Sequence, residues 1–110
     1  MELESSVDAT VESDRVVFEY TVENVGDEPA ELTFRSSLRA DFAVLAGDEE
    51  VWRASEGRMF AQALQTETVD PGDAAVFSGA WDDPSPGEYT VVAALNATDD
   101  DAEARTDFSV

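Results

Sequence analysis

Carboxylates are the main reactive groups of this chain. Its 110 residues hold 26 aspartates and glutamates against six arginines, with no lysine, histidine or cysteine. The commonest general base and metal ligand is therefore missing, and there is neither a thiol nucleophile nor a disulfide. No pair of carboxylates lies beside an apolar segment that would raise the pKa of one member alone, as acid–base catalysis requires. We predict that the protein is not an enzyme and has no catalytic residue.

Acidic turns are the second place to look for chemistry. The segments DPGD, WDDPSPGE and TDDDAE gather oxygen ligands of the kind that Ca²⁺ and Mg²⁺ prefer. None of them has the glycine and the terminal bidentate acid of a complete calcium-binding loop. We interpret them as solvated turns, and we predict no metal ion and no other cofactor.

One segment differs from the rest of the chain. VWRASEGRMFAQAL, residues 51–64, contains one of the two tryptophans, a methionine, a phenylalanine and two of the six arginines. Residues 32–63 hold four arginines and five acids, a net charge of −1, so −19 falls on the other 78 residues. The surface formed by residues 32–63 is therefore expected to repel an acidic partner less than the rest of the chain does.

The large side chains of this segment are expected to fix it to the fold. Ordering the backbone costs about 1–2 kcal/mol per residue, and burying a Phe or Met returns about 1.5–3 kcal/mol. A loop of this length therefore needs anchors, and we predict that Trp52 and Phe60 serve as such. The side chains that remain as candidates to contact a partner are Arg53, Glu56, Arg58 and Met59.

Local ion pairing is the alternative role for these arginines. Arg39 has Asp41 or a neighbouring strand within reach, and Glu56 is close in sequence to both Arg53 and Arg58.

A period of two dominates the hydrophobic pattern and predicts strands. It is clearest over residues 16–24 and recurs over 29–35, 87–96 and 101–110, with a weaker version over 2–11. Three further short apolar runs, DFAVLAG, EEVWRA and DAAVFSGAW, alternate less cleanly. Gly, Pro and Asp in the intervening segments provide the chain reversals.

About seven to nine short strands with frequent turns are typical of an immunoglobulin-like β-sandwich, mainly antiparallel. The length suits one domain over residues 1–110. We expect neither a signal peptide nor a membrane span, because no basic N-terminal region and no long apolar run is present.

The net charge also indicates which partners and which cellular environment to expect for the protein. A chain this acidic does not present a phosphate-neutralising face, so we predict no nucleic-acid partner. Acids spread along the whole chain, with no lysine, are typical of a cytoplasmic protein from a salt-accumulating halophile. Salt at molar concentration shortens the Debye length to about 3 Å and screens the repulsion.

The segments FEYTVENVGDEPAELTFRSSLRADFAV, EEVWRASEGRMFAQALQTETVDPGD and WDDPSPGEYTVVAAL resemble the BsuPI-type intracellular proteinase inhibitor family. The resemblance covers nearly the whole chain and implies a small, all-β, immunoglobulin-like domain. The positions that carry it are Asn24, Pro29, Ser36, Arg39, Asp41, Phe42, Trp52, Ser55, Met59, Phe60, Pro71, Gly72, Trp81, Pro86, Gly87 and Tyr89.

Two functions follow. The resemblance implies an inhibitor of an intracellular, subtilisin-like serine protease that acts by non-covalent protein–protein binding. The alternative is a non-inhibitory protein-binding or structural domain of the same fold, which would interact through a sheet edge or its arginine-bearing face. The oligomeric state does not follow from the sequence.

Overall fold

The computed structural model describes residues 2–57, 59–98 and 102–110. Within these residues the chain forms nine β-strands and no helix. The strands are β1 (Leu3–Val11), β2 (Arg15–Asn24), β3 (Ala30–Phe34), β4 (Ala40–Ala46), β5 (Glu49–Arg53), β6 (Gln65–Val69), β7 (Ala74–Asp82), β8 (Glu88–Leu95) and β9 (Glu103–Ser109). All the pairings are antiparallel, so the prediction of an all-β fold with seven to nine strands is confirmed.

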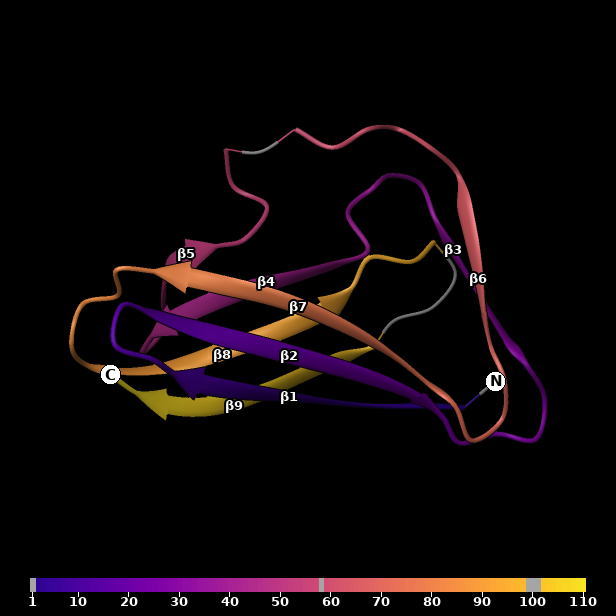
Figure 1. Ribbon diagram of the computed structural model, residues 1–110, viewed down its shortest axis with the longest axis horizontal. Coiled ribbons are helices and arrows are strands. Elements are labelled where there is room, and N and C mark those ends of the chain that lie inside the picture. Colours follow the sequence, from indigo (N-terminus) through magenta and orange to yellow (C-terminus); the bar gives the residue numbers. More distant parts are fainter. Residues whose placement is uncertain (1, 58, 99–101) are drawn as a thin grey trace.

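The strands make two packed sheets and a small third one (Figure 1). One sheet has the order β1-β2-β7 and the other has the order β5-β4-β8-β9. β3 and β6 pair with each other at the right-hand end of the view, next to the N-terminus, whereas the C-terminus lies at the opposite end (Figure 1). The segment between β5 and β6 passes over the top of the same view.

β2 shows most directly how the sequence produces the sandwich. Its alternate residues Val16, Phe18, Tyr20 and Val22 are fully buried, as the period of two predicts. The strand pairs without a register shift with β1 on one side and β7 on the other. It is therefore the central strand of its sheet, and its inward face forms much of the core.

The weakly patterned segments follow the expectation less closely. Val11, at the end of β1, is 45% exposed, although its spacing predicts an inward position. The hydrophobic pattern does not predict β6 as a strand, since its sequence QTETV has a single apolar residue, Val69. It forms because β3 supplies a partner along its whole length.

Asn24 is the one buried polar side chain among the described residues. Its Nδ2 donates to the carbonyls of Glu28 at 2.7 Å and Val69 at 2.9 Å, and its Oδ1 accepts from the N–H of Gly26 at 3.0 Å. A buried amide with these partners is satisfied. Asn24 thus ties the turn after β2 to the end of β6.

The two long sides of the sandwich differ. On one side β1 packs along β9, and the Ser5 hydroxyl donates to the Glu103 carbonyl at 3.1 Å. On the other side β7 pairs only with β2. There Phe42 of β4 packs directly on Gly79 of β7, where a Cβ would lie 2.8 Å from the ring. This second side carries the candidate site.

Candidate functional site

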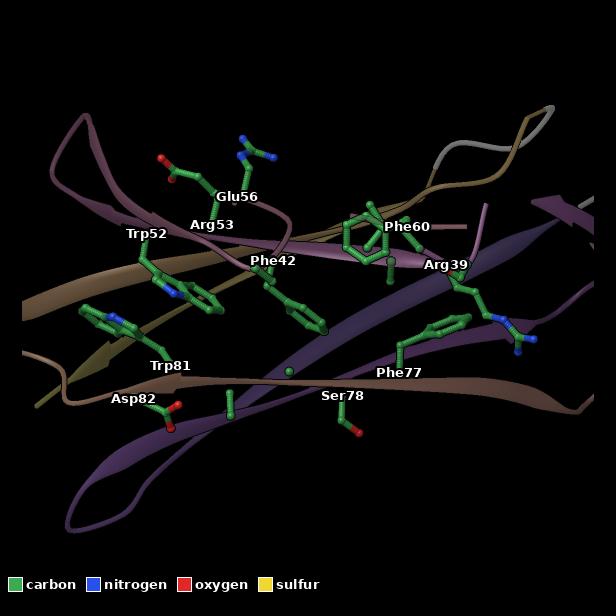
Figure 2. Close-up of a pocket in the computed structure, with 16 residues that line it drawn as sticks. Arg39, Phe42, Trp52, Arg53, Glu56, Phe60, Phe77, Ser78, Trp81 and Asp82 are labelled. Carbon is green, nitrogen blue, oxygen red and sulfur yellow. The ribbon is translucent and has the colours of Figure 1, made fainter. Parts of the chain in front are cut away.

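A groove of about 530 Å³ opens between β7 and the β4–β5 hairpin (Figure 2). Below, the term "β7 groove" denotes this cavity. Its walls are the segments 37–40, 52–54 and 77–82 together with Phe42, Glu56 and Phe60. Figure 2 shows β7 running along one wall, with Trp52 facing Trp81 at one end and Phe60 lying opposite Phe77 farther along.

Trp52 lies on an aromatic cluster at the end of the β7 groove. Its ring stacks on that of Trp81, with centroids 6.3 Å apart and planes 28° apart, and it lies 6.0 Å from Phe18 in the core. Trp81 in turn meets Tyr89 edge to face at 4.9 Å. These contacts are what a loop anchor needs, because large aromatic rings bury much apolar area.

Asp41 fixes the start of the segment 54–64, which is called the β5–β6 loop below. Its carboxylate accepts from the N–H of Ser55 at 3.1 Å and from the Ser55 hydroxyl at 2.6 Å. The N–H of Ala54 donates to the Phe42 carbonyl at 2.9 Å. The chain leaving β5 is therefore held against β4.

A second tie holds the far half of the loop. The N–H of Ser37 donates to the Ala61 carbonyl at 2.9 Å, and the N–H of Ala61 donates to the Ser37 hydroxyl at 3.1 Å. Ser37 and Ala61 thus bond in both directions, so the β5–β6 loop is fixed on either side of its middle.

Those predicted contact residues that the structure describes lie between or beside these ties. Met59 is 100% exposed and Glu56 is also exposed, while Phe60 is partly buried and lines the β7 groove. Gly57 has φ of +72°, a left-handed conformation that favours glycine in this turn. Arg58 lies outside the described residues.

Arg53 has two acidic partners on its own hairpin. Its guanidinium pairs with Glu50, and it donates to Asp41 at 3.1 Å. The hydrogen bond that Arg53 donates to Glu50, followed by the one that it donates to Asp41, raises the pKa of Arg53. Its predicted pairing partner Glu56 is not among its ion-pair partners, because the hairpin already places two other carboxylates beside it.

Arg39 links the groove to the small sheet. Its guanidinium pairs with Glu67 and donates to the Gln65 side chain at 2.7 Å, and it lies over the Phe34 ring at 5.9 Å. The expected partner on a neighbouring strand is thus found on β6, and the wall at Arg39 is held to β3 and β6.

The described part of the chain contains no cluster of three acidic side chains arranged to hold a metal ion. It also contains no helix of the length and apolarity that a membrane crossing requires. The site is therefore suited to binding through its shape. It consists of an aromatic groove and a fixed loop with one exposed methionine.

Sequence reasoning missed the residues that hold the loop. The hydrogen bonds of Ser37 and Asp41 depend on how β4 meets β5, which local spacing does not reveal. The signal that points to them is the segment SSLRADF, whose polar residues lie just before β4 or at its start.

The sequence matches the BsuPI family, described as "Intracellular proteinase inhibitor", over residues 3–100. The chain belongs to the BsuPI family. The resemblance seen in the sequence is therefore confirmed, and its positions Asp41, Trp52, Ser55 and Phe60 surround the β7 groove or hold the β5–β6 loop. No curated protein matches the chain significantly.

Solved structures with a similar fold are distant in sequence. The CARDB domain of the PF1109 protein from Pyrococcus furiosus, solved with di-metal ions, aligns with a TM-score of 0.53 and 15% identity, over 99% of this chain and 92% of that one. The β-glucosidase of Kluyveromyces marxianus aligns with a TM-score of 0.55 and 17% identity, over 99% of this chain. This BsuPI member spans only 14% of that enzyme. These likenesses support the immunoglobulin-like fold.

Proposed function

We propose that this BsuPI protein inhibits a subtilisin-like serine protease by non-covalent binding of the β5–β6 loop to the active-site cleft. The observation that carries the proposal is the position of Met59. Its side chain is fully exposed between two fixed points of the loop, the Asp41–Ser55 and Ser37–Ala61 bonds. Family membership supports a protease as the partner and an inhibitor rather than an enzyme.

The two fixed points matter because association penalises mobile loops. Each flexible side chain or segment that must be ordered on binding weakens the complex, whereas a segment held beforehand avoids that penalty. The loop meets this condition on both sides of Met59, while the left-handed Gly57 completes the turn that leads to it. Met59 fills a protease pocket in this proposal, and Glu56 and Arg58 flank it.

Arg53 has a supporting role in this proposal. Its pairs with Glu50 and Asp41 hold it beside the base of the loop, where its exposed part lies at the rim of the contact. Rim charges mainly affect association rates rather than affinity. We place the complex in the cytoplasm of a salt-accumulating cell, in keeping with the family description and the net charge of −20.

The test is a titration of the protein against subtilisin-like, trypsin-like and chymotrypsin-like proteases in molar KCl. We expect inhibition of the subtilisin-like enzymes. The variant Met59→Asp should weaken it by about 30-fold or more, since the loss of a central hot spot is worth at least about 2 kcal/mol. Val11→Asp is the matched control, because Val11 is also an exposed apolar residue but lies on β1.

Absence of inhibition by the folded protein would refute the proposal and leave a non-inhibitory binding domain. Equal inhibition by Met59→Asp and the parent would refute the assignment of the loop.

A further inference from the structure

β7 is an edge strand without the usual protection against pairing with another chain. Eight consecutive residues, Ala74–Trp81, carry no charge, in a chain where 29% of the residues are charged. Natural edge strands commonly carry charges or bulges that prevent added pairing. The only charge of β7 is at its last residue, Asp82, whereas each of the other edge strands has a charged residue inside its ends: Glu4 in β1, Glu31 in β3, Glu50 in β5, Glu67 in β6 and Arg105 in β9.

The main chain of β7 is also regular and accessible. Its pairing with β2 runs from Asp82 to Ala74 without a register shift, so no bulge bends it. Among the described residues, no backbone hydrogen bond reaches residues 74–82 from any element other than β2. Six consecutive residues, 77–82, line the β7 groove, so the groove borders the strand edge rather than one face alone (Figure 2).

We propose that the β7 edge binds an extended segment of a partner protein as an added strand. In an antiparallel or parallel pair, alternate side chains of that segment point to the same side. On the inner side they enter the β7 groove, where Phe42, Trp52 and Phe60 provide an apolar surface. The segment therefore has apolar residues at alternate positions.

Charge defines the ends of the segment. Asp73 precedes the uncharged run, and Asp82 and Asp83 follow it. Lysine or arginine at both ends of the bound segment would meet these acids. A second copy of this chain is disfavoured as the occupant, because antiparallel pairing of two β7 edges would bring Asp73 of one copy close to Asp82 and Asp83 of the other.

This inference goes beyond the inhibitor proposal, since it concerns main-chain pairing at β7 and does not involve Met59. Its test uses no protease, so the failure of one proposal would leave the other unaffected. Both tryptophans of the chain line the β7 groove, which makes their fluorescence a local reporter.

The probe is a peptide of about ten residues that alternates valine and threonine and has two lysines at each end. Two further versions of this peptide carry methyl groups on alternate main-chain nitrogens. One is methylated at the odd-numbered positions and the other at the even-numbered positions. We expect saturable binding of the parent peptide and protection of amides within residues 74–82 from hydrogen exchange. One methylated version should lose about tenfold or more in affinity and the other much less, because only one frame of N–H groups faces β7.

A matched pair of variants tests the charge complementarity. Asp82 and Asp8 are both exposed and lie at opposite edges of the same sheet. Asp82→Asn should weaken binding of the lysine-flanked peptide, whereas Asp8→Asn should not. A glutamate-flanked peptide should bind least.

Three results would overturn the proposal: no binding while circular dichroism shows a folded protein, equal affinity of the two methylated peptides, or protection outside residues 74–82. Sedimentation of the protein alone as a dimer protected at β7 would also overturn it, because the occupant would then be a second copy.

Discussion

The Asp41 carboxylate binds Ser55 twice, through the main-chain N–H at 3.1 Å and through the hydroxyl at 2.6 Å. Asp41 lies near the start of β4, and Ser55 is the second residue after β5. The same carboxylate accepts from Arg53 at 3.1 Å. One side chain therefore sets both the end of the hairpin and the start of the loop that carries Met59.

Replacement of Asp41 by alanine tests this relationship. The N–H of Ser55 and the Arg53 guanidinium lose an acceptor in a partly buried site, so we expect a loss of about 1–3 kcal/mol in the free energy of unfolding. Limited proteolysis should cut the β5–β6 loop faster in the variant than in the parent. Asp48→Ala is the control, because Asp48 is exposed and substitutions of this kind usually change stability by less than about 0.5 kcal/mol. Equal cleavage of the two variants would contradict the prediction.

The contact between Gly79 and Phe42 gives a second prediction. A Cβ at position 79 would lie 2.8 Å from the Phe42 ring, which is too close for a real contact. Gly79→Ala should cost about 1–3 kcal/mol through overpacking, measured by denaturant unfolding in molar KCl. Combining it with Phe42→Leu should cost less than the sum of the two single variants, since the smaller side chain relieves the clash. Additive costs would show that the contact does not limit the packing.

Asn24 gives a third prediction about the turn after β2. Asn24→Ala leaves the carbonyls of Glu28 and Val69 and the N–H of Gly26 without their partner. The bond to Val69 is buried and the other two are partly buried. A buried group left unsatisfied costs about 1–3 kcal/mol, so we expect a total of about 2–3 kcal/mol. Asn96→Ala is the comparison, since exposed Asn96 donates to the Leu38 carbonyl at 2.8 Å. The comparison variant should lose about 1 kcal/mol or less, and similar losses in both would contradict the role given to Asn24.

These residues also show how far the sequence alone predicts the fold. The alternation in β2 and β3 predicts which residues are buried, because a strand between solvent and core must alternate. The sequence does not predict β6, because this strand forms by pairing with β3. The paired residues of the two strands are 31 or more positions apart in the sequence. Local pattern contains no information on such a partner.

The candidate site was predicted less completely than the fold. Composition alone indicated the segment 51–64 and its aromatic residues. Neither the bond of Asp41 to Ser55 nor the groove beside β7 is visible in local spacing, because the bond depends on how β4 pairs with β5 and the groove on how that hairpin packs beside β7. The sequence predicts a strand over the uncharged run in β7, but only the sheet order shows that this strand is an edge.

The burial of Tyr20 leads us to predict that the protein becomes less stable at alkaline pH. Its ring is fully buried, and its hydroxyl donates to the Ala102 carbonyl at 2.8 Å. Burial, as the largest cause, raises the pKa of Tyr20 above its usual value of 10. The unfolded chain therefore loses this proton at lower pH than the folded chain, and the free energy of unfolding falls as the pH rises above about 10.

The variant Tyr20→Phe tests whether Tyr20 causes this fall in stability at alkaline pH. It removes the titrating hydroxyl, so the decline of stability at alkaline pH should become shallower, although the lost hydrogen bond costs about 1 kcal/mol at neutral pH. Denaturant midpoints measured from pH 7 to pH 11 compare the two proteins. Tyr89→Phe serves as the control, because the Tyr89 hydroxyl bonds the Ser85 carbonyl in an exposed setting. A parallel decline in parent and Tyr20→Phe would rule out Tyr20 as the cause.

The net charge of −20 predicts that salt stabilises the fold. Among the described residues only Arg15, Arg39, Arg53 and Arg105 form ion pairs, so most acids have no cationic partner. Their repulsion acts over about 10 Å at 0.1 M salt and over about 3 Å at 1 M, because screening shortens the Debye length. The unfolding temperature should therefore rise steadily from tens of millimolar to molar KCl. Sodium chloride should give nearly the same curve if screening is the cause, whereas a temperature that stays constant across the range would show that repulsion does not limit stability.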